Sequence, residues 1–135
     1  MAKRGADAAR VLLIDDSKLI RFSAQKILGS DFEVVLAEDG EDGWASIESD
    51  PGIGVVFTDL SMPNLDGFGL LERVRGSADS RIRDLPVIVV TSGEEAQTRQ
   101  KAFDLGATDF ITKPFDSVNL LARARAHASR RAGGE

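Results

Sequence analysis

Residues 54–67 read GVVFTDLSMPNLDG, an apolar run that ends in an acid and is followed by a polar loop and a glycine. The run from Gly54 to Phe57 predicts a buried strand by its length and its β-branched content. Asp59 to Asp66 predicts a loop, and Gly67 to about Arg75 predicts a helix. A strand, a loop and a helix in this order are typical of one unit of an α/β protein.

The same alternation continues on both sides of this unit. Further strands are predicted at residues 11–14, 33–37, 87–90 and 108–111, and further helices at residues 17–28, 40–49, 94–105 and 116–130. Five strands that alternate with five helices favour a parallel sheet covered on both faces. We therefore predict an α/β fold with a doubly wound, five-stranded parallel sheet of order 2-1-3-4-5, which is the flavodoxin-like arrangement.

The composition restricts the class of protein. Of 135 residues, 42% are hydrophobic and 29% charged, which is typical of a soluble globular protein. This length fits one domain, which we place at residues 10–131, between a flexible tail at 1–9 and a tail or linker start at 132–135. The absence of cysteine excludes disulfides and thiolate chemistry, and the net charge of -5 argues against nucleic-acid binding. No apolar run is as long as a membrane span, and the absence of cysteine fits a reducing cytoplasm, where we expect the protein.

Polar side chains follow four of the five predicted strands. Asp15 and Asp16 follow the first strand, Asp59 the third, Thr91 the fourth and Lys113 the fifth. In an open α/β sheet, sites form outside the carboxyl ends of the strands, at the point where the strand order reverses. The predicted topology therefore brings three carboxylates, a hydroxyl and an ammonium group to one edge of the sheet.

Each of these residues also has an ordinary structural explanation. Asp16 or Ser17 could cap a helix, and Asp59 could form a turn. Thr91 could satisfy the backbone at a strand end, and Lys113 could be a solvated surface residue. These explanations stay open for the single residues, but they do not account for the convergence of all of them.

The predicted cluster of carboxylates has an electrostatic consequence. Two carboxylates about 5 Å apart repel each other by roughly 3 kcal/mol at an effective dielectric constant near 20. A hard divalent cation such as Mg²⁺ suits oxygen ligands and would offset the repulsion. An acceptor carboxylate, a metal and fixed donors are also what phosphoryl transfer requires, and Asp59 would then form an acyl phosphate.

Four segments of the chain resemble the receiver domains of bacterial response regulators, including the single-domain chemotaxis regulators. The segments are Leu13-Ile14-Asp15-Asp16-Ser17, residues 56–67, Val89-Val90-Thr91-Ser92 and Thr112-Lys113-Pro114-Phe115. Together, in this order and at these spacings, they form a specific signal. The resemblance extends from about Val11 to about Arg130 and implies the receiver fold.

The resemblance implies a role for each residue of the predicted site. Asp59 would be the phosphoacceptor, and Asp15 and Asp16 the acidic pair that holds Mg²⁺. Asp59 and the backbone carbonyl of Ser61 would be further metal ligands. Lys113 would pair with the phosphoryl group, and a cis bond to Pro114 is expected as in relatives.

The resemblance also implies a switch. Thr91 would move toward the phosphoryl group, and Phe110 stands where many relatives have a tyrosine, so that its ring would follow Thr91. The face formed by the fifth strand and the last two helices would then change shape. Ser61 and Gly93 occupy positions that set the lifetime of the phosphorylated state in relatives, and both are small.

Three other functions share features with this sequence. A haloacid-dehalogenase-like phosphatase normally has a second acid two residues after its nucleophile, where this chain has Ser61. A flavodoxin-like cofactor binder is disfavoured because the acidic residues Asp15 and Asp16 would repel a phosphate. A receiver-like interaction module that is not phosphorylated is the remaining alternative. We expect a signalling switch and not an enzyme that turns over an external substrate.

The expected partners follow from the switch. His127 is the only histidine and is interpreted as a surface residue, so the phosphodonor is expected to be a sensor histidine kinase, a phosphotransfer protein or a small molecule. The output would be a downstream effector, and a homodimer through the last helices is left open. The chain would act alone or be part of a longer regulator, such as a diguanylate cyclase. In the last helix, Val118, Leu121 and Ala124 are expected to face inward.

Overall fold

A single parallel sheet forms the centre of the protein. The computed structural model describes residues 9–92 and 95–132. Its five strands lie in the order β2-β1-β3-β4-β5, which confirms the predicted topology. The strands are β1 (Arg10–Ile14), β2 (Glu33–Ala37), β3 (Ile53–Thr58), β4 (Val87–Thr91) and β5 (Asp109–Thr112).

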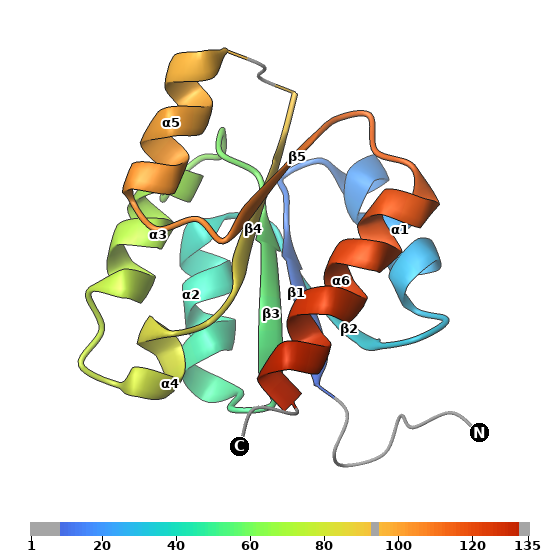
Figure 1. Ribbon diagram of the computed structural model, residues 1–135, viewed down its shortest axis with the longest axis horizontal. Coiled ribbons are helices and arrows are strands. Elements are labelled where there is room, and N and C mark those ends of the chain that lie inside the picture. The colour runs from blue at the N-terminus through green and yellow to red at the C-terminus, as the bar shows by residue number, and fades with distance from the viewer. Residues whose placement is uncertain (1–8, 93–94, 133–135) are drawn as a thin grey trace.

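Helices cover both faces of the sheet, so the predicted fold class is confirmed (Figure 1). The helices are α1 (Lys18–Leu28), α2 (Gly40–Ser49), α3 (Gly67–Arg75), α4 (Ser80–Arg83), α5 (Ala96–Asp104) and α6 (Ser117–Ala132). α1 and α6 lie on one face, and α2, α3 and α5 lie on the other (Figure 1). α4 was not predicted, because a helix of four residues is too short to show a helical repeat.

The alternation of side chains along β1 divides the core into two layers. Leu12 and Ile14 pack with the buried residues of α2, α3 and α5, while Val11 and Leu13 pack with those of α1 and α6. Successive side chains of a strand point to opposite faces, so a strand covered on both faces must be apolar throughout. β3 meets this requirement most fully, since all six of its residues are buried.

The inward face of α6 agrees with the prediction at Ala124, which is buried, and at Leu121, which is partly buried against the core, but not at Val118. Val118 is 76% exposed, and the buried positions of the helix include Leu120, Ala124 and His127. Spacings of four and three residues keep side chains on one helical face, whereas the predicted stripe began two residues too early. His127 was expected at the surface and is 8% exposed, with Nε2 3.3 Å from Oδ2 of Asp109 in β5. That interpretation was wrong because a charged partner on the sheet allows the ring to be buried.

None of the helices in the described part of the chain combines the length and the apolar character that crossing a bilayer requires.

Candidate functional site

The ends of β1 and β3 bring the three acidic residues together. Ile14 and Thr58 are the last residues of these neighbouring strands and lie opposite each other in the parallel register. Asp59, the residue directly after β3, donates its backbone N–H to the carbonyl of Ile14 at 3.0 Å. This backbone bond places Asp59 beside Asp15, at the edge of the sheet where the strands end.

Asp15, Asp16 and Asp59 form the acidic cluster of the site. One carboxylate oxygen of each lies within 4.8 Å of the others. Asp15 and Asp59 are buried, with exposed fractions of 2% and 7%, while Asp16 is exposed to solvent. Three converging carboxylate oxygens, one of them open to water, are the kind of ligands that a hard divalent cation prefers, so the residues present fit Mg²⁺.

The loop after β1 is held by a helix cap. The hydroxyl of Ser17 accepts a hydrogen bond from the N–H of Ile20 and caps α1, while the N–H of Ser17 donates to Oδ1 of Asp15 at 2.9 Å. The structural explanation is therefore correct for Ser17. It does not compete with the functional one, because capping by Ser17 leaves the carboxylate of Asp16 unused.

The loop after β3 holds Asp59 in a tight turn. The N–H of Leu60 donates to Oδ1 of Asp59 at 2.7 Å, and the hydroxyl of Thr58 donates to the carbonyl of Asp59 at 2.9 Å. Gly67 passes so close that a Cβ there would lie 2.4 Å from that carbonyl oxygen, so the turn requires glycine. One oxygen of Asp59 is thus fixed by the backbone, and the other faces Lys113.

Lys113 joins the fifth strand to the acidic cluster. Its Nζ lies 2.8 Å from Oδ2 of Asp15 and 3.2 Å from Oδ2 of Asp59. The backbone N–H of Lys113 donates to the carbonyl of Thr91 at 2.9 Å. The peptide bond between Lys113 and Pro114 is cis, as the resemblance implied. Burial alone lowers the pKa of Lys113, but the hydrogen bond to Asp15 and the charges of Asp59 and Asp15 outweigh it, so the net pKa is raised.

The two predicted switch residues lie on neighbouring strands. Thr91 ends β4 and is 6% exposed, and Phe110 lies in β5 with the same exposure. The guanidinium carbon of Arg99, in α5, lies 4.8 Å from the centroid of the Phe110 ring, and the centroid of the Phe103 ring lies 6.3 Å from it. The Phe110 side chain is therefore enclosed between the sheet and α5.

Ser61, a predicted metal ligand through its backbone carbonyl, is exposed to solvent. It lies in the loop after β3. Gly93, the other position expected to affect the lifetime of a phosphorylated state, lies outside the described residues.

The contact of Arg21 with the site was not predicted from the sequence. Nη1 of Arg21, in α1, donates to the backbone carbonyl of Asp15 at 2.8 Å. The basic residue could be seen on the predicted helix, but its partner is a backbone atom, which no pattern of side chains identifies.

A comparison with protein families supports this arrangement. The model of the response regulator receiver domain matches residues 11–125. Response regulator MprA from Mycobacterium tuberculosis is 37% identical over 120 residues, which are 88% of this chain and 50% of that protein. Response regulator MprA from Mycobacterium ulcerans is 36% identical over 120 residues. The chain thus spans about half the length of these relatives.

Solved structures show the same fold. Chemotaxis protein CheY4 of Vibrio cholerae matches with a TM-score of 0.81 and 29% identity, over 89% of this chain and 98% of that one. A CheY-like response regulator receiver domain protein from Methanospirillum hungatei matches with a TM-score of 0.83 and 25% identity, over 95% of this chain and 99% of that one.

Proposed function

The chain belongs to the response regulator receiver domain family, and from this premise we propose that it is a phosphoryl-accepting switch of a two-component system. The observation that carries the proposal is the contact of one partly buried ammonium group, that of Lys113, with both Asp15 and Asp59. Receiver domains are signalling switches, and we propose no turnover of an external substrate.

Asp59 is the proposed phosphoacceptor. One of its carboxylate oxygens attacks phosphorus, the P–N bond of a phosphohistidine breaks, and the histidine nitrogen leaves with the electron pair and is protonated. The turn at Asp59 supports this role, because Oδ1 accepts a hydrogen bond from the backbone while Oδ2 faces Lys113 and the acidic cluster. Lys113 then lies where it can pair with an oxygen of the transferred group.

Receiver domains bind Mg²⁺ at an acidic cluster, and this chain has such a cluster. We propose that Asp15, Asp16, Asp59 and the backbone carbonyl of Ser61 hold the ion, with Asp15 or Asp16 acting directly or through water. When bound, Mg²⁺ supplies positive charge next to the oxygens of the transferred group. The exposure of Asp16 supports an approach of the ion from solvent.

The proposed output is a change of the surface around Phe110. The added phosphoryl oxygens accept hydrogen bonds from Thr91 and Lys113, and this attraction favours a state in which Thr91 has moved toward Asp59. The space that Thr91 leaves is filled by the Phe110 ring. Because Arg99 and Phe103 contact that ring, its movement changes the face of α5 and β5.

The proposed switch unit is residues 10–131. Its phosphodonor is a sensor histidine kinase, a phosphotransfer protein or a small molecule such as acetyl phosphate. Its output is a downstream effector protein or effector domain, with a homodimer through the last helices as a further state. We propose a cytoplasmic location and no direct nucleic-acid binding, since the net charge of the chain is -5.

The test is phosphorylation by acetyl phosphate, read as intact mass. The protein is incubated with acetyl phosphate and Mg²⁺, beside an Asp59→Asn variant and a sample without metal. We expect one phosphoryl adduct that requires both Asp59 and the metal. An adduct that persists in Asp59→Asn would move the acceptor to another residue. No adduct, together with no binding of beryllofluoride, would favour the interaction module that is not phosphorylated.

A further inference from the structure

We propose that Arg21 is a positioning residue for the metal site, because its guanidinium group fixes the peptide that joins Asp15 to Asp16. The inference rests on the proposed binding of Mg²⁺ by this pair. It concerns the orientation of the two acids and not their identity.

The proposal rests on a hydrogen bond from the side chain of Arg21 to a residue that precedes it in the sequence. The N–H of Arg21 donates to the carbonyl of Ser17 in the first turn of α1, while Nη1 donates to the carbonyl of Asp15 at 2.8 Å. Side chains of a helix point toward its N-terminus, which explains how Arg21 reaches a residue six positions earlier. Arg21 is partly buried, and no carboxylate in the described part of the chain forms an ion pair with it.

The backbone and side chain of Asp15 are held at four atoms. Its N–H donates to the carbonyl of Ala37 at 3.1 Å, and its Oδ1 accepts from the N–H of Ser17 at 2.9 Å. Its Oδ2 accepts from Lys113 at 2.8 Å. The fourth atom is the carbonyl oxygen, and Arg21 is the group that holds it.

This carbonyl belongs to the peptide plane from which Asp16 extends. A peptide group is rigid and planar, so fixing its oxygen also fixes the direction in which the Asp16 backbone leaves. Asp16 is exposed, whereas the packed environment of Asp15 restrains that residue from several sides. The loss of the Arg21 contact is therefore expected to affect the placement of the Asp16 carboxylate most.

Charge and position act in opposite directions at Arg21, and this makes the proposal testable. A positive charge close to a cation site opposes metal binding, so its removal should strengthen Mg²⁺ binding if charge were the only effect. Loss of positioning should weaken binding, because groups that orient metal ligands typically contribute about tenfold or more to affinity. The sign of the change therefore separates the two effects.

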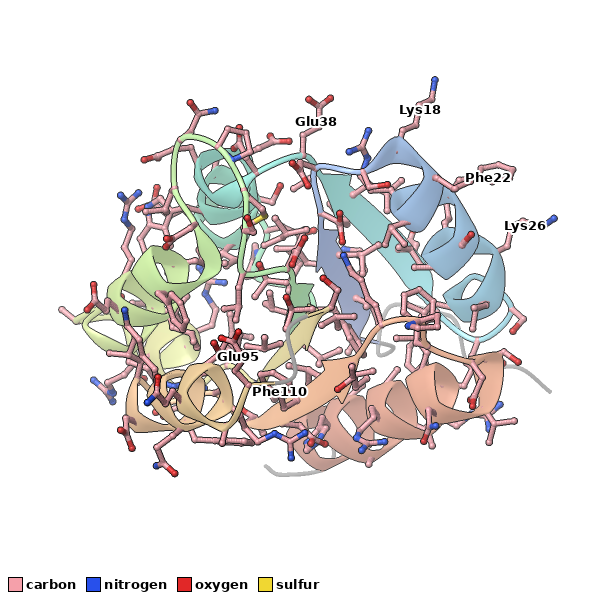
Figure 2. All side chains as sticks on the ribbon, turned by 90° about the horizontal axis from the view of Figure 1, so that it is seen from above. Lys18, Phe22, Lys26, Glu38, Glu95 and Phe110 are labelled. Carbon is pink, nitrogen blue, oxygen red and sulfur yellow. The ribbon has the colours of Figure 1, made fainter. Side chains whose placement is uncertain are left out.

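The experiment is titration calorimetry with Mg²⁺ alone on the full chain and three variants. Arg21→Ala should raise the dissociation constant about tenfold. Arg21→Lys, which keeps a donor and the charge, should recover most of the affinity and also covers the case in which Arg21→Ala does not fold. Lys18→Ala is the matched control, because Lys18 is an exposed cation at the start of the same helix and points away from the sheet (Figure 2).

The outcomes separate this inference from the proposed function. Unchanged or tighter Mg²⁺ binding by folded Arg21→Ala, with normal binding by the unmodified protein, would overturn the role of Arg21 alone. A lower melting temperature with an unchanged dissociation constant would assign Arg21 to stability and would also overturn the proposal. No binding of Mg²⁺ by the unmodified protein would overturn the metal site and this inference together.

Discussion

The ammonium nitrogen of Lys113 lies 3.2 Å from Oδ2 of Asp59, although the two residues are 54 positions apart in the chain. The same nitrogen contacts Asp15, so one cation offsets the repulsion between two buried acids. A bound metal would draw on the same two carboxylates. Before phosphorylation, Lys113 and Mg²⁺ are therefore expected to compete for these two carboxylates. Once a phosphoryl group is bound, both cations are expected to stabilise its negative charge.

Replacement of Lys113 should separate metal binding from phosphoryl acceptance. In Lys113→Gln the acidic cluster loses a competing cation, so Mg²⁺ should bind more tightly. Formation of the adduct with acetyl phosphate should be slower by about a hundredfold, because a fixed donor to the transferred group is lost. Calorimetry and a mass time course measure the two effects. Lys26→Gln, an exposed lysine on α1, is the control, and a normal adduct rate in Lys113→Gln would contradict the assigned role.

Mg²⁺ should stabilise the protein through Asp16. At a concentration of one hundred times the dissociation constant, an ion that binds only the folded state adds about 2.7 kcal/mol to the free energy of unfolding. Asp16→Asn should lose most of this gain. Without metal, its free energy of unfolding should differ little from that of the unmodified protein, because the side chain is exposed. Urea unfolding with and without Mg²⁺ measures both values.

The matched control for Asp16 is Glu38, an exposed acid that follows β2 at the same edge of the sheet and points away from it (Figure 2). Glu38→Gln should keep the full stabilisation by Mg²⁺. An equal loss in both variants would mean that the effect of Asp16 is one of general charge and not of ligation.

Removal of the Thr91 hydroxyl should uncouple Phe110 from phosphorylation. A hydrogen bond to a charged group contributes about 1.5–3 kcal/mol, and its loss shifts the balance of the two switch states by about ten- to a hundredfold. Thr91→Ala should still form the adduct but lose the change in the ring resonances of Phe110 and Phe103 in NMR spectra. Thr91→Ser keeps the hydroxyl and should retain the change. The same spectral change in Thr91→Ala would mean that another group couples the site to α5.

The sequence predicts the sheet well because its apolar runs and its strand ends are local features. Asp15, Asp59 and Lys113 could be placed together before their contacts were known, because the alternation of strands and helices favours a doubly wound sheet and the order 2-1-3-4-5 was chosen for it. The hydrogen-bond partners of the arginines could not be predicted from the ends of the strands. Arg75 is partly buried and donates to the carbonyls of Arg83, Leu85 and Gly106, and its pKa is lowered by burial.

The reason for this difference is the nature of the partner. An acidic residue after an apolar run can be recognised in the sequence. Every residue has a backbone carbonyl, so the sequence does not show which carbonyl accepts a hydrogen bond from an arginine. Arg21 and Arg75 both donate to carbonyls outside their own helices, so their partners depend on how the chain packs. The same holds for His127, whose burial depends on Asp109 in a strand 18 residues earlier.

The ion pair of Arg10 with Asp50, at the beginning of β1, should make stability depend on pH. Nε and Nη2 of Arg10 donate to the two carboxylate oxygens of Asp50 at 2.9 and 2.6 Å. These hydrogen bonds are the main reason that the pKa of Asp50 is lowered from 3.8, and the N–H of Gly52 and the charges of Arg10 and Arg81 add to them against the effect of burial. A lowered pKa means that the folded protein holds the proton less tightly than the unfolded chain.

The resulting stability is therefore present above pH 3.8 and is lost as the pH falls through the lower value of the folded state. Because both side chains are partly exposed, Asp50→Asn should cost about 1 kcal/mol at pH 7. This difference from the unmodified protein should shrink as the pH falls below 3.8, as urea midpoints at each pH would show. Asp84→Asn, an exposed acid in the loop before β4, should stay within about 0.5 kcal/mol throughout. A cost for Asp50→Asn that is as large at pH 3 as at pH 7 would mean that Arg10 binds the neutral side chain equally well, and that packing, not charge, holds the start of β1.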